Sequence, residues 1–327
     1  MCQEITASAP AKLILCGEHA VVYERPAIAI PVHGVRARVS ITAAQTGSGI
    51  LIHAPDLGRS WRPDILADDP LSLLIISLIE RFNAIQRQAS QALLPDLLIS
   101  ISSEIPIASG MGSGAAIATA LVRGLAAYYG QQLSPAEVSM LVYTSEQAYH
   151  GTPSGIDNTV VAYEQPICFT RRPAGQVPLI EPITIRQPLH LLIADTGIRS
   201  ATKLPVGEVR RRWQADPEHY EALFNTIGAL ALEVRASLEG NGPSLGPLLN
   251  HNQQLLQQLG VSSPELDQLV DVALKAGALG AKLSGAGWGG VMIVLIAPEQ
   301  CAIIRAALLS AGAVRVFETT LGGGAGG

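Results

Sequence analysis

The chain of 327 residues has few charged and few aromatic side chains. Charged residues make up 15 % and aromatic residues 4 %, whereas hydrophobic residues reach 48 %, which is typical of a compact folded protein. The aromatic residues form no cluster that would stack on single-stranded nucleic acid. The net charge is −5, and the three consecutive arginines at 210–212 are the main basic cluster, interpreted as solvated helix surface. We therefore expect no nucleic-acid partner.

Long hydrophobic runs and clustered cysteines are also missing. The apolar run at 291–297 is far shorter than the roughly 20 residues that span a bilayer, so we expect no membrane partner. The first ten residues lack the basic and then apolar order of a secretory signal, which indicates a cytoplasmic protein. Four widely separated cysteines form neither a zinc motif nor a disulfide framework, and reduced thiols are expected. These cysteines are Cys2, Cys16, Cys168 and Cys301.

The order of apolar runs predicts an α+β chain. Short runs rich in Ile and Val indicate strands at 12–17, 27–32, 35–43 and 49–54. Helical periodicity follows from Asp69 and again after Ser113. Ser134 and Glu137 have the spacing of a capping box, with proline at the first helical position, and predict a helix that ends near Tyr149.

A proline-rich segment divides this pattern from a second one. Residues 171–188 contain four prolines, and we place a domain boundary before Pro188. Beyond it, strands at 189–197, 291–297 and 314–321 alternate with helices around 208–239, 245–259, 263–277 and from Pro298. That order predicts helices on one face of an antiparallel sheet. The expected parts are an N-terminal domain at 1–187, a C-terminal domain at 188–320 and a flexible glycine-rich tail at 321–327.

The glycine-rich stretch SGMGSG, at residues 109–114, is followed at once by a helical pattern. Glycines let a backbone approach a ligand closely, and the first turn of a helix leaves N–H groups unpaired, so the two together favour an anion site. The stretch lacks the lysine of GxxxxGK[ST] and the third glycine of GxGxxG. Considered alone, it is explained equally well by close helix packing.

A second glycine-rich loop, AKLSGAGWGG at residues 281–290, lies between strand-like segments. Two such loops beside regular structure are hard to explain as turns, so they favour ligand binding. In SAPAKLILCGEHAVVY, Lys12, Glu18 and His19 lie at or beyond the end of an apolar strand. They would face a cleft or, in the plainer interpretation, form surface charge on a hairpin.

The fourth informative stretch is SEQAYHGTPSGIDNTV. Glu146 lies on the predicted helix, and Asp157 follows a turn rich in Gly, Pro and Ser. An aspartate in this position caps a helix more often than it catalyses a reaction, so the residue alone leaves both roles open.

Together, the four stretches resemble the motifs of the GHMP kinases. PAKLILCGEHAVVY matches the form P-A-K-x-x-x-x-G-E-H-x-V-V-Y, and PIASGMGSGAA resembles P-x-x-x-G-L-G-S-S-A-A. KLSGAGWGG matches K-L-[ST]-G-A-G-x-G-G, and HGTPSGID matches H-G-x-P-S-G-x-D. The forms GEH and HGTPSGID are most similar to those of the members that phosphorylate mevalonate for isoprenoid synthesis. The resemblance spans nearly the whole chain, in the family's order.

The resemblance implies a two-domain α+β fold with the active site in the cleft between domains. The N-terminal domain would be ribosomal protein S5 domain 2-like, and the C-terminal domain a ferredoxin-like α/β sandwich. ATP and Mg²⁺ are the implied cofactors, and the primary hydroxyl of mevalonate is the implied phosphate acceptor. A homodimer is a further expectation from the same resemblance.

The resemblance also implies roles for individual residues. Asp157 would accept the hydroxyl proton, and Lys12 would lie beside it. Glu146 would bind Mg²⁺, with Ser113 as a further ligand. The nucleotide would be bound by Pro106, Ala108, Ser109, Gly110, Met111, Gly112, Ser113 and Gly114. The substrate would be bound by Glu18, His19, His150, Gly285 and Ala286.

Two positions depart from the family's pattern. Gly114 replaces a serine whose hydroxyl is linked to magnesium, so we expect weaker metal affinity. Trp288 stands where glycine is common and would either cover the nucleotide or narrow the cleft. Two alternatives stay open: a kinase for phosphomevalonate or another small hydroxy acid, and a non-catalytic sensor of the same fold. A phosphorylated substrate would require more basic residues than Lys12, and a sensor would be expected to lose the base or the metal carboxylate.

Overall fold

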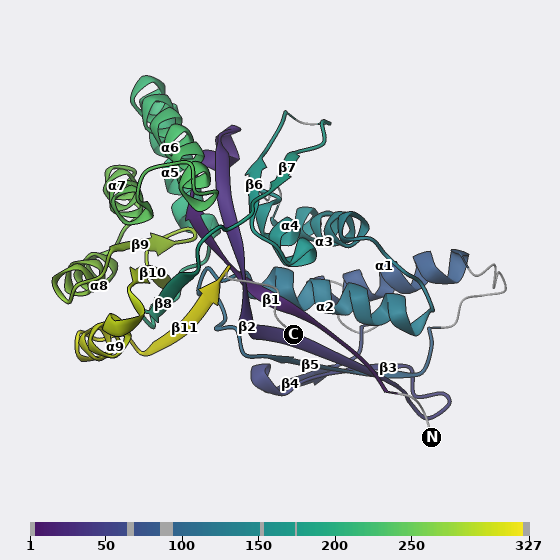
Figure 1. The fold of residues 1–327 in the computed structure, drawn as a ribbon. Coiled ribbons are helices and arrows are strands. Elements are labelled where there is room, and N and C mark those ends of the chain that lie inside the picture. Colours follow the sequence, from purple (N-terminus) through teal and green to yellow (C-terminus); the bar gives the residue numbers. More distant parts are fainter. Residues whose placement is uncertain (1–3, 64–68, 86–93, 151–153, 174, 323–327) are drawn as a thin grey trace. The chain divides into compact units, whose positions relative to one another are not determined.

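The computed structural model describes residues 4–63, 69–85, 94–150, 154–173 and 175–322 (Figure 1). The chain packs into two compact units, each discontinuous in sequence. The first unit consists of residues 1–11, 33–106 and 112–164, and the second of residues 12–32, 107–111 and 165–327. The expected division at residue 188 stays a prediction. Leu321 ends the last strand, and residues 323–327 of the expected tail lie outside the described residues.

The first unit contains a sheet whose strand β5 (Leu97–Ser103) has a partner on each side. It pairs in antiparallel fashion with the second half of β2 (Pro26–Ala43) and in parallel with β3 (Ile50–Ala54). Strand β3 also pairs with β4 (Arg59–Trp61), after the short 3-10 helix η2 (Pro55–Leu57). Along β5, buried Leu and Ile alternate with more exposed residues, so one face of the sheet joins the core.

In the part of the first unit that the structure describes, the helices are α1 (Pro70–Ile85), α2 (Ser113–Tyr128), α3 (Pro135–His150) and α4 (Ile156–Tyr163). Helices α2, α3 and α4 contact one another, and α2 also contacts β5. The predicted capping box is confirmed, because Ser134 N–H donates to Glu137 Oε2 at 2.8 Å and Glu137 N–H donates to Ser134 Oγ at 3.3 Å.

Strand β2 corrects one prediction. Two strands were expected at 27–32 and 35–43, but Pro26–Ala43 forms one continuous strand of 18 residues. Its first residues, Pro26–Ala29, pair with β6, and Ala37–Ala43 pair with β5. Pro31 and Gly34 lie between these two registers, where neither strand requires an N–H group from them.

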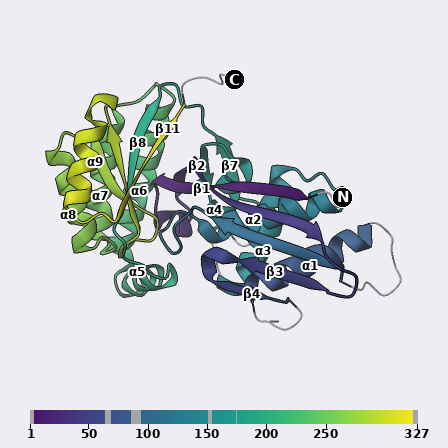
Figure 2. The same ribbon diagram turned by 90° about the horizontal axis from the view of Figure 1, so that it is seen from below.

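The second unit contains a four-stranded antiparallel sheet in the order β11-β8-β10-β9 (Figures 1 and 2). Its strands are β8 (Leu189–Asp195), β9 (Gly280–Ser284), β10 (Val291–Ile296) and β11 (Arg315–Leu321). Helices α7 (Leu245–Gln258), α8 (Pro264–Lys275) and α9 (Cys301–Ser310) pack against these strands, and η3 (Pro298–Gln300) precedes α9. The expected arrangement of helices on an antiparallel sheet is confirmed.

The helix expected around 208–239 is two helices, α5 (Lys203–Ala215) and α6 (Pro217–Leu238). The prediction of one helix was wrong because Asp216 caps a new one: its side chain accepts a hydrogen bond from His219 N–H at 3.2 Å. Proline at the first position of α6 favours the same start.

One strand lies just before the proline-rich segment, and another lies within it. Strand β6 (Ile167–Thr170) pairs with β7 (Leu179–Pro182) and with the start of β2. Strand β1 (Ile5–Cys16) pairs with β2 as well, and the 3-10 helix η1 (Ala20–Tyr23) connects the two.

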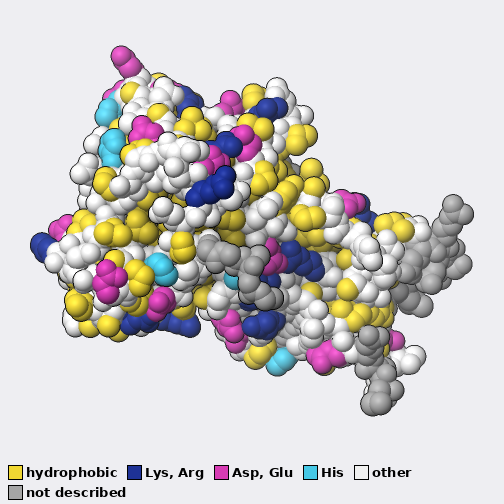
Figure 3. All heavy atoms as spheres, viewed as in Figure 1, with side chains coloured by type: hydrophobic (Ala, Val, Ile, Leu, Met, Phe, Trp, Pro, Cys, Tyr) yellow, Lys and Arg dark blue, Asp and Glu magenta, His cyan; other side chains and the backbone are white. Residues whose placement is uncertain are grey.

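Charge is mixed on the surface drawn in Figure 3. On that face, Lys and Arg side chains lie among Asp and Glu side chains and form no extended basic area. Within the described part of the chain, no helix combines the length and the apolar character needed to cross a membrane.

Candidate active site

The second unit brings together residues from three of the four motif stretches. Lys12 N–H donates to Met111 O at 3.0 Å, which joins β1 to the first glycine-rich loop. Ser284, at the end of β9, accepts a hydrogen bond from Ile14 N–H at 3.0 Å. Val291 N–H donates to Ser109 O at 3.2 Å and joins the two glycine-rich loops. These contacts link segments far apart in the sequence into one site.

Glycines allow the two loops to approach backbone to backbone. Gly110 has a φ of +83°, and a Cβ atom there would lie 3.0 Å from Ser284 O. A Cβ atom on Gly290 would lie 2.5 Å from Ser109 O. Real Cβ atoms do not tolerate the shorter distance, so close packing within the second unit requires glycine at residue 290, and the space at Gly110 is tight.

Glu18 and Lys282 form a fully buried ion pair, with 1 % and 0 % of their side chains exposed. Lys282 Nζ donates to Glu18 Oε1 and also to the carbonyl oxygens of Ile14 and Leu283. Burial raises the pKa of Glu18, and the charge of Lys282 opposes that rise. Among the described residues, Glu18 Oε2 has no hydrogen-bond partner.

The sequence motifs gave no separate role to Lys282. A single lysine within the apolar segment around β9 was the available signal, because a charged residue in a buried strand requires a partner. That partner, Glu18, belongs to the first motif.

His19 is buried and has an unusual backbone conformation for a non-glycine residue, with a φ of 61°. Its Nε2 lies 2.9 Å from Ala286 O. Burial lowers the pKa of His19 to about 4, although the hydrogen bond to Ala286 acts in the opposite direction. The imidazole is therefore neutral at pH 7, and its proton lies on Nε2 because a carbonyl oxygen can only accept. This leaves Nδ1 as an acceptor, which suits a hydroxyl donor.

Trp288 packs the second glycine-rich loop against the turn that joins α7 to α8. Its main-chain N–H donates to Val261 O at 2.8 Å, and its indole N–H donates to Gly260 O at 2.9 Å. The residue has a positive φ of 57°. Trp288 therefore has a structural contact that neither sequence-based expectation included.

The end of β8 holds the other side of this loop. Thr196 donates to Gly290 O from its main-chain N–H at 2.9 Å and from its hydroxyl at 2.8 Å. The adjacent Asp195 is buried and accepts two hydrogen bonds from Arg199, at 2.7 and 2.8 Å. The contacts of Trp288 and Gly290 thus hold this loop against two neighbouring segments.

Within the first unit, Asp157 lies in the first turn of α4, and Glu146 lies on α3. Both side chains are half-buried. The adjacent Asn158 donates from Nδ2 to Ser139 Oγ at 2.9 Å and to Ser139 O at 3.1 Å, which holds α4 on α3. His150 ends α3, and its side chain lies outside the described residues.

The start of α2 suits an anion. Gly112 is the N-cap residue, with a φ of 73°, and no side chain caps the first turn. Gly114 is exposed, and a Cβ atom there would meet nothing within 4 Å. Before this start, Pro106 and Ala108 lie at a turn, where Ala108 has a φ of 53°. The first-turn N–H groups and the dipole of such a helix start favour a bound anion.

No three His, Cys, Asp or Glu side chains gather as a metal site within the described residues. Mg²⁺ often uses one or two carboxylates together with phosphate oxygens and water, so the residue types of Glu146 and Ser113 fit it. Lys12 belongs to the second unit and Asp157 to the first. Their proximity stays a prediction, as do the assignments of individual site residues.

Comparison with known proteins establishes the class. Residues 75–165 match the family described as GHMP kinases N terminal domain, and residues 234–315 match GHMP kinases C terminal. The chain belongs to the GHMP kinases, as its motifs predicted.

The proteins that resemble this chain include named mevalonate kinases. A mevalonate kinase of Thermococcus sibiricus is 33 % identical over 328 residues, which is 95 % of each chain. The crystal structure of L. major mevalonate kinase in complex with R-mevalonate has a TM-score of 0.78 and 27 % identity, covering 97 % of this chain and 95 % of that one. The Methanococcus jannaschii mevalonate kinase structure has a TM-score of 0.79 at 24 % identity, covering 98 % and 99 %, and supports the shared fold.

Proposed function

We propose that this chain is an ATP-dependent kinase that phosphorylates the primary C5 hydroxyl of mevalonate and releases 5-phosphomevalonate and ADP. The observation that carries this proposal is the joining of the first and third motifs by buried contacts. Glu18 pairs with Lys282, and His19 pairs with Ala286. Identity to a named mevalonate kinase over nearly the whole chain supports the same substrate.

Phosphoryl transfer requires positioning and charge stabilisation more than covalent chemistry from the protein. In this proposal, the oxygen of the C5 hydroxyl attacks the terminal phosphate of ATP, and Asp157 accepts the proton of that hydroxyl. Lys12 stabilises the negative charge that develops on that oxygen. The buried position of Lys12 strengthens such a charge interaction.

The nucleotide phosphates are assigned to the loop at 106–114 and to the N–H groups that begin α2. Gly112 provides no side-chain cap, so these groups are available to phosphate oxygens. Glu146 and Ser113 would hold Mg²⁺, which supplies positive charge to the phosphate oxygens.

The substrate end is assigned to Glu18, His19, His150, Gly285 and Ala286. A neutral His19 keeps Nδ1 as a hydrogen-bond acceptor, so it can accept from a substrate hydroxyl. The carbonyl of Ala286 fixes the orientation of the ring. The cytoplasmic location and the homodimer stay predictions.

The direct experiment measures ADP release by the purified protein with ATP, Mg²⁺ and one acceptor at a time. The acceptors are mevalonate, phosphomevalonate, homoserine and galactose. We expect release with mevalonate alone. Release with phosphomevalonate alone would favour the alternative kinase, and release with none would favour the sensor.

Asp157→Asn tests the assigned base. We expect ADP release to fall by at least about 10²-fold while ATP binding stays unchanged, because the amide keeps the shape but cannot accept the proton. Asp271→Asn, at an exposed carboxylate on α8, is the matched control and should keep full activity. Retained turnover in Asp157→Asn would remove Asp157 from this role.

A further inference from the structure

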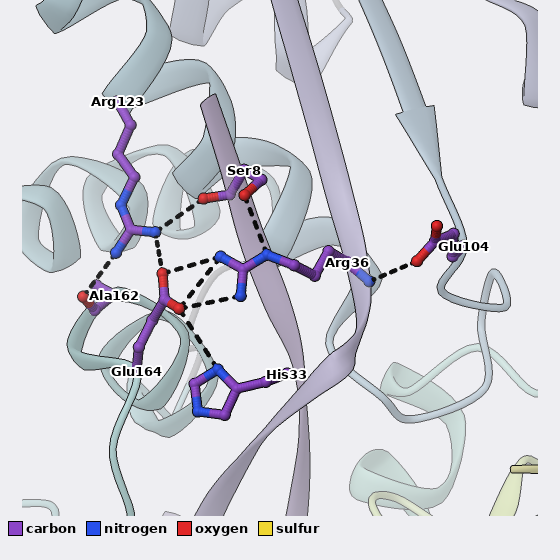
Figure 4. A network of polar contacts seen from close by, with 7 residues as sticks. All are labelled: Ser8, His33, Arg36, Glu104, Arg123, Ala162 and Glu164. Atoms are coloured by element: carbon purple, nitrogen blue, oxygen red, sulfur yellow. Dashed lines mark hydrogen bonds and ion pairs between the residues drawn. The ribbon is translucent and has the colours of Figure 1, made fainter. Parts of the chain in front are cut away.

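We propose that Glu164 is a positioning residue that fixes helix α4, and with it Asp157, against the neighbouring elements of the first unit. Glu164 ends α4 with a left-handed backbone, at a φ of 51°, and its N–H donates to Val160 O at 3.0 Å. Figure 4 shows the side chains that surround its carboxylate. The importance of Asp157 in this inference rests on the proposed function.

Two arginines from different elements bind the carboxylate of Glu164. Arg123 of α2 donates from Nη1 to Oε1, and Arg36 of β2 donates from Nη1 and Nη2 to Oε2, at 3.1 Å each. His33 Nδ1 lies 3.6 Å from Oε2. Burial would raise the pKa of Glu164, but hydrogen bonds from His33 and both arginines lower it to about 2. The carboxylate is therefore charged at neutral pH and can hold both arginines.

The same arginines reach β1 and the last turn of α4 (Figure 4). Arg123 donates from Nη2 to Ala162 O at 3.0 Å and from Nη1 to Ser8 O at 2.9 Å. Arg36 donates from Nε to Ser8 Oγ at 3.0 Å. One cluster of side chains thus joins α2, α4, β1 and β2, and all of its members belong to the first unit.

Helix α4 depends on contacts with other elements because it is short. It has eight residues, and helices of this length are not stable alone in water. A carboxylate at the C-terminal end of a helix is also repelled by the helix dipole. Glu164 therefore stabilises the position of α4 through the arginines of other elements, and not through the helix itself.

The opposite ends of α2 and α4 carry residues of the proposed reaction. Asp157 lies in the first turn of α4, whereas Glu164 follows its last turn. Ser113 begins α2, and Arg123 lies toward the other end of that helix. A shift of α4 at the cluster would move Asp157, and misplacement of a reacting group by about 1 Å can lower a rate by about 10²-fold.

The test compares Glu164→Gln with Glu104→Gln in the full chain. Glu104 is the matched control because its contacts are with β2: it accepts from Arg36 N–H at 3.3 Å and lies 3.7 Å from Arg38. We expect Glu164→Gln to lower kcat with mevalonate about tenfold, with the KM values for ATP and mevalonate within about twofold of wild type. Glu104→Gln should change neither. Equal kcat values in the two variants would overturn the positioning role.

Amide hydrogen exchange gives a readout that does not depend on activity. In Glu164→Gln, the amides of residues 156–163 should exchange faster, while those of residues 135–147 on α3 keep their rates. Unchanged exchange in α4 would overturn the anchor. If the wild type releases no ADP with mevalonate, the proposed function fails, but the exchange result still decides this inference. Arg123→Lys keeps the charge and loses the forked geometry, so it should act in the same direction and serves if Glu164→Gln does not fold.

Discussion

Lys282 and Glu18 are separated by 264 positions in the sequence, yet they form an ion pair that is closed off from solvent. Their pairing fixes the third motif to the first within the second unit. A buried ion pair need not stabilise a protein relative to an apolar pair, but removal of one partner leaves an uncompensated charge. Substitution of either residue is therefore expected to destabilise the proposed substrate site.

Lys282→Met should lower the free energy of unfolding by about 3 to 5 kcal/mol, because Glu18 would stay buried without a counter-charge. The variant Glu18→Gln combined with Lys282→Met should recover part of this loss, since no charge is then left unpaired. Denaturant unfolding of the wild type, both single variants and the double variant would measure the coupling. Additive losses in the double variant would contradict the coupling.

His19 should make the stability of the protein depend on pH. Its pKa is about 4 in the folded state and ordinarily 6.5, so the unfolded state binds more protons between these values. The contribution of His19 to the free energy of unfolding is thus fully present above pH 6.5. It is lost as the pH drops toward 4, by about 3 kcal/mol in total.

His19→Asn tests this dependence, because asparagine tolerates a positive φ and does not titrate. The stability difference between wild type and His19→Asn should shrink as the pH falls from 6.5 to 4, as measured by denaturant unfolding. His251→Gln, at an exposed position on α7, is the control and should leave the pH dependence of the wild type in place. A constant difference between wild type and His19→Asn would remove His19 from the explanation.

The composition of the glycine-rich loops predicted a ligand site. The structure shows that close packing between the loops also favours glycine at two of these positions. At Gly110 and Gly290, the backbone of one loop occupies the space that a side chain would need. Local patterns also predicted most helices, because capping residues and periodicity lie within one segment. The break at Asp216 had a local signal as well, an aspartate followed by proline at a helix start.

Other features have no local signal. The pairing of Lys282 with Glu18 and the cluster around Glu164 each join residues from distant segments, and one sequence contains no record of such contacts. The continuity of β2 through Pro31 depends on which partner strand lies beside each half of it. The relation of Lys12 to Asp157 comes from the family resemblance alone.

Gly110→Ala should destabilise the protein by about 1 to 3 kcal/mol and weaken ATP binding, because the residue has a positive φ and faces Ser284 O. Gly130→Ala is the matched control: Gly130 also has a positive φ, of 64°, but nothing lies within 4 Å of its Cβ position. Denaturant unfolding and ATP titration of both variants would separate two effects. One is the cost of a positive φ in alanine, which both variants share, and the other is the contact with Ser284 O, which only Gly110→Ala makes. Equal effects on ATP binding would contradict a role for the close approach.

Gly114→Ser should lower the Mg²⁺ concentration needed for half-maximal activity by several fold. The hydroxyl restores the side chain that the family has at this position, and the structure leaves room for it because nothing lies within 4 Å. Gly114→Ala is the control, since it adds a Cβ atom without a metal ligand. If Gly114→Ser leaves the Mg²⁺ dependence unchanged, the missing serine does not weaken metal binding.

Trp288→Phe should raise the KM for mevalonate several fold and lower the free energy of unfolding by about 1 kcal/mol. The variant loses the indole donor to Gly260 O, so the loop that carries Gly285 and Ala286 is held less firmly. Trp213→Phe, on α5, is the matched control, because it loses a comparable indole hydrogen bond to Glu221 Oε1 of α6, at 3.0 Å. Steady-state kinetics and unfolding of both variants are compared. If the KM is unchanged in Trp288→Phe, the indole contact stabilises the fold without setting the position of the substrate loop.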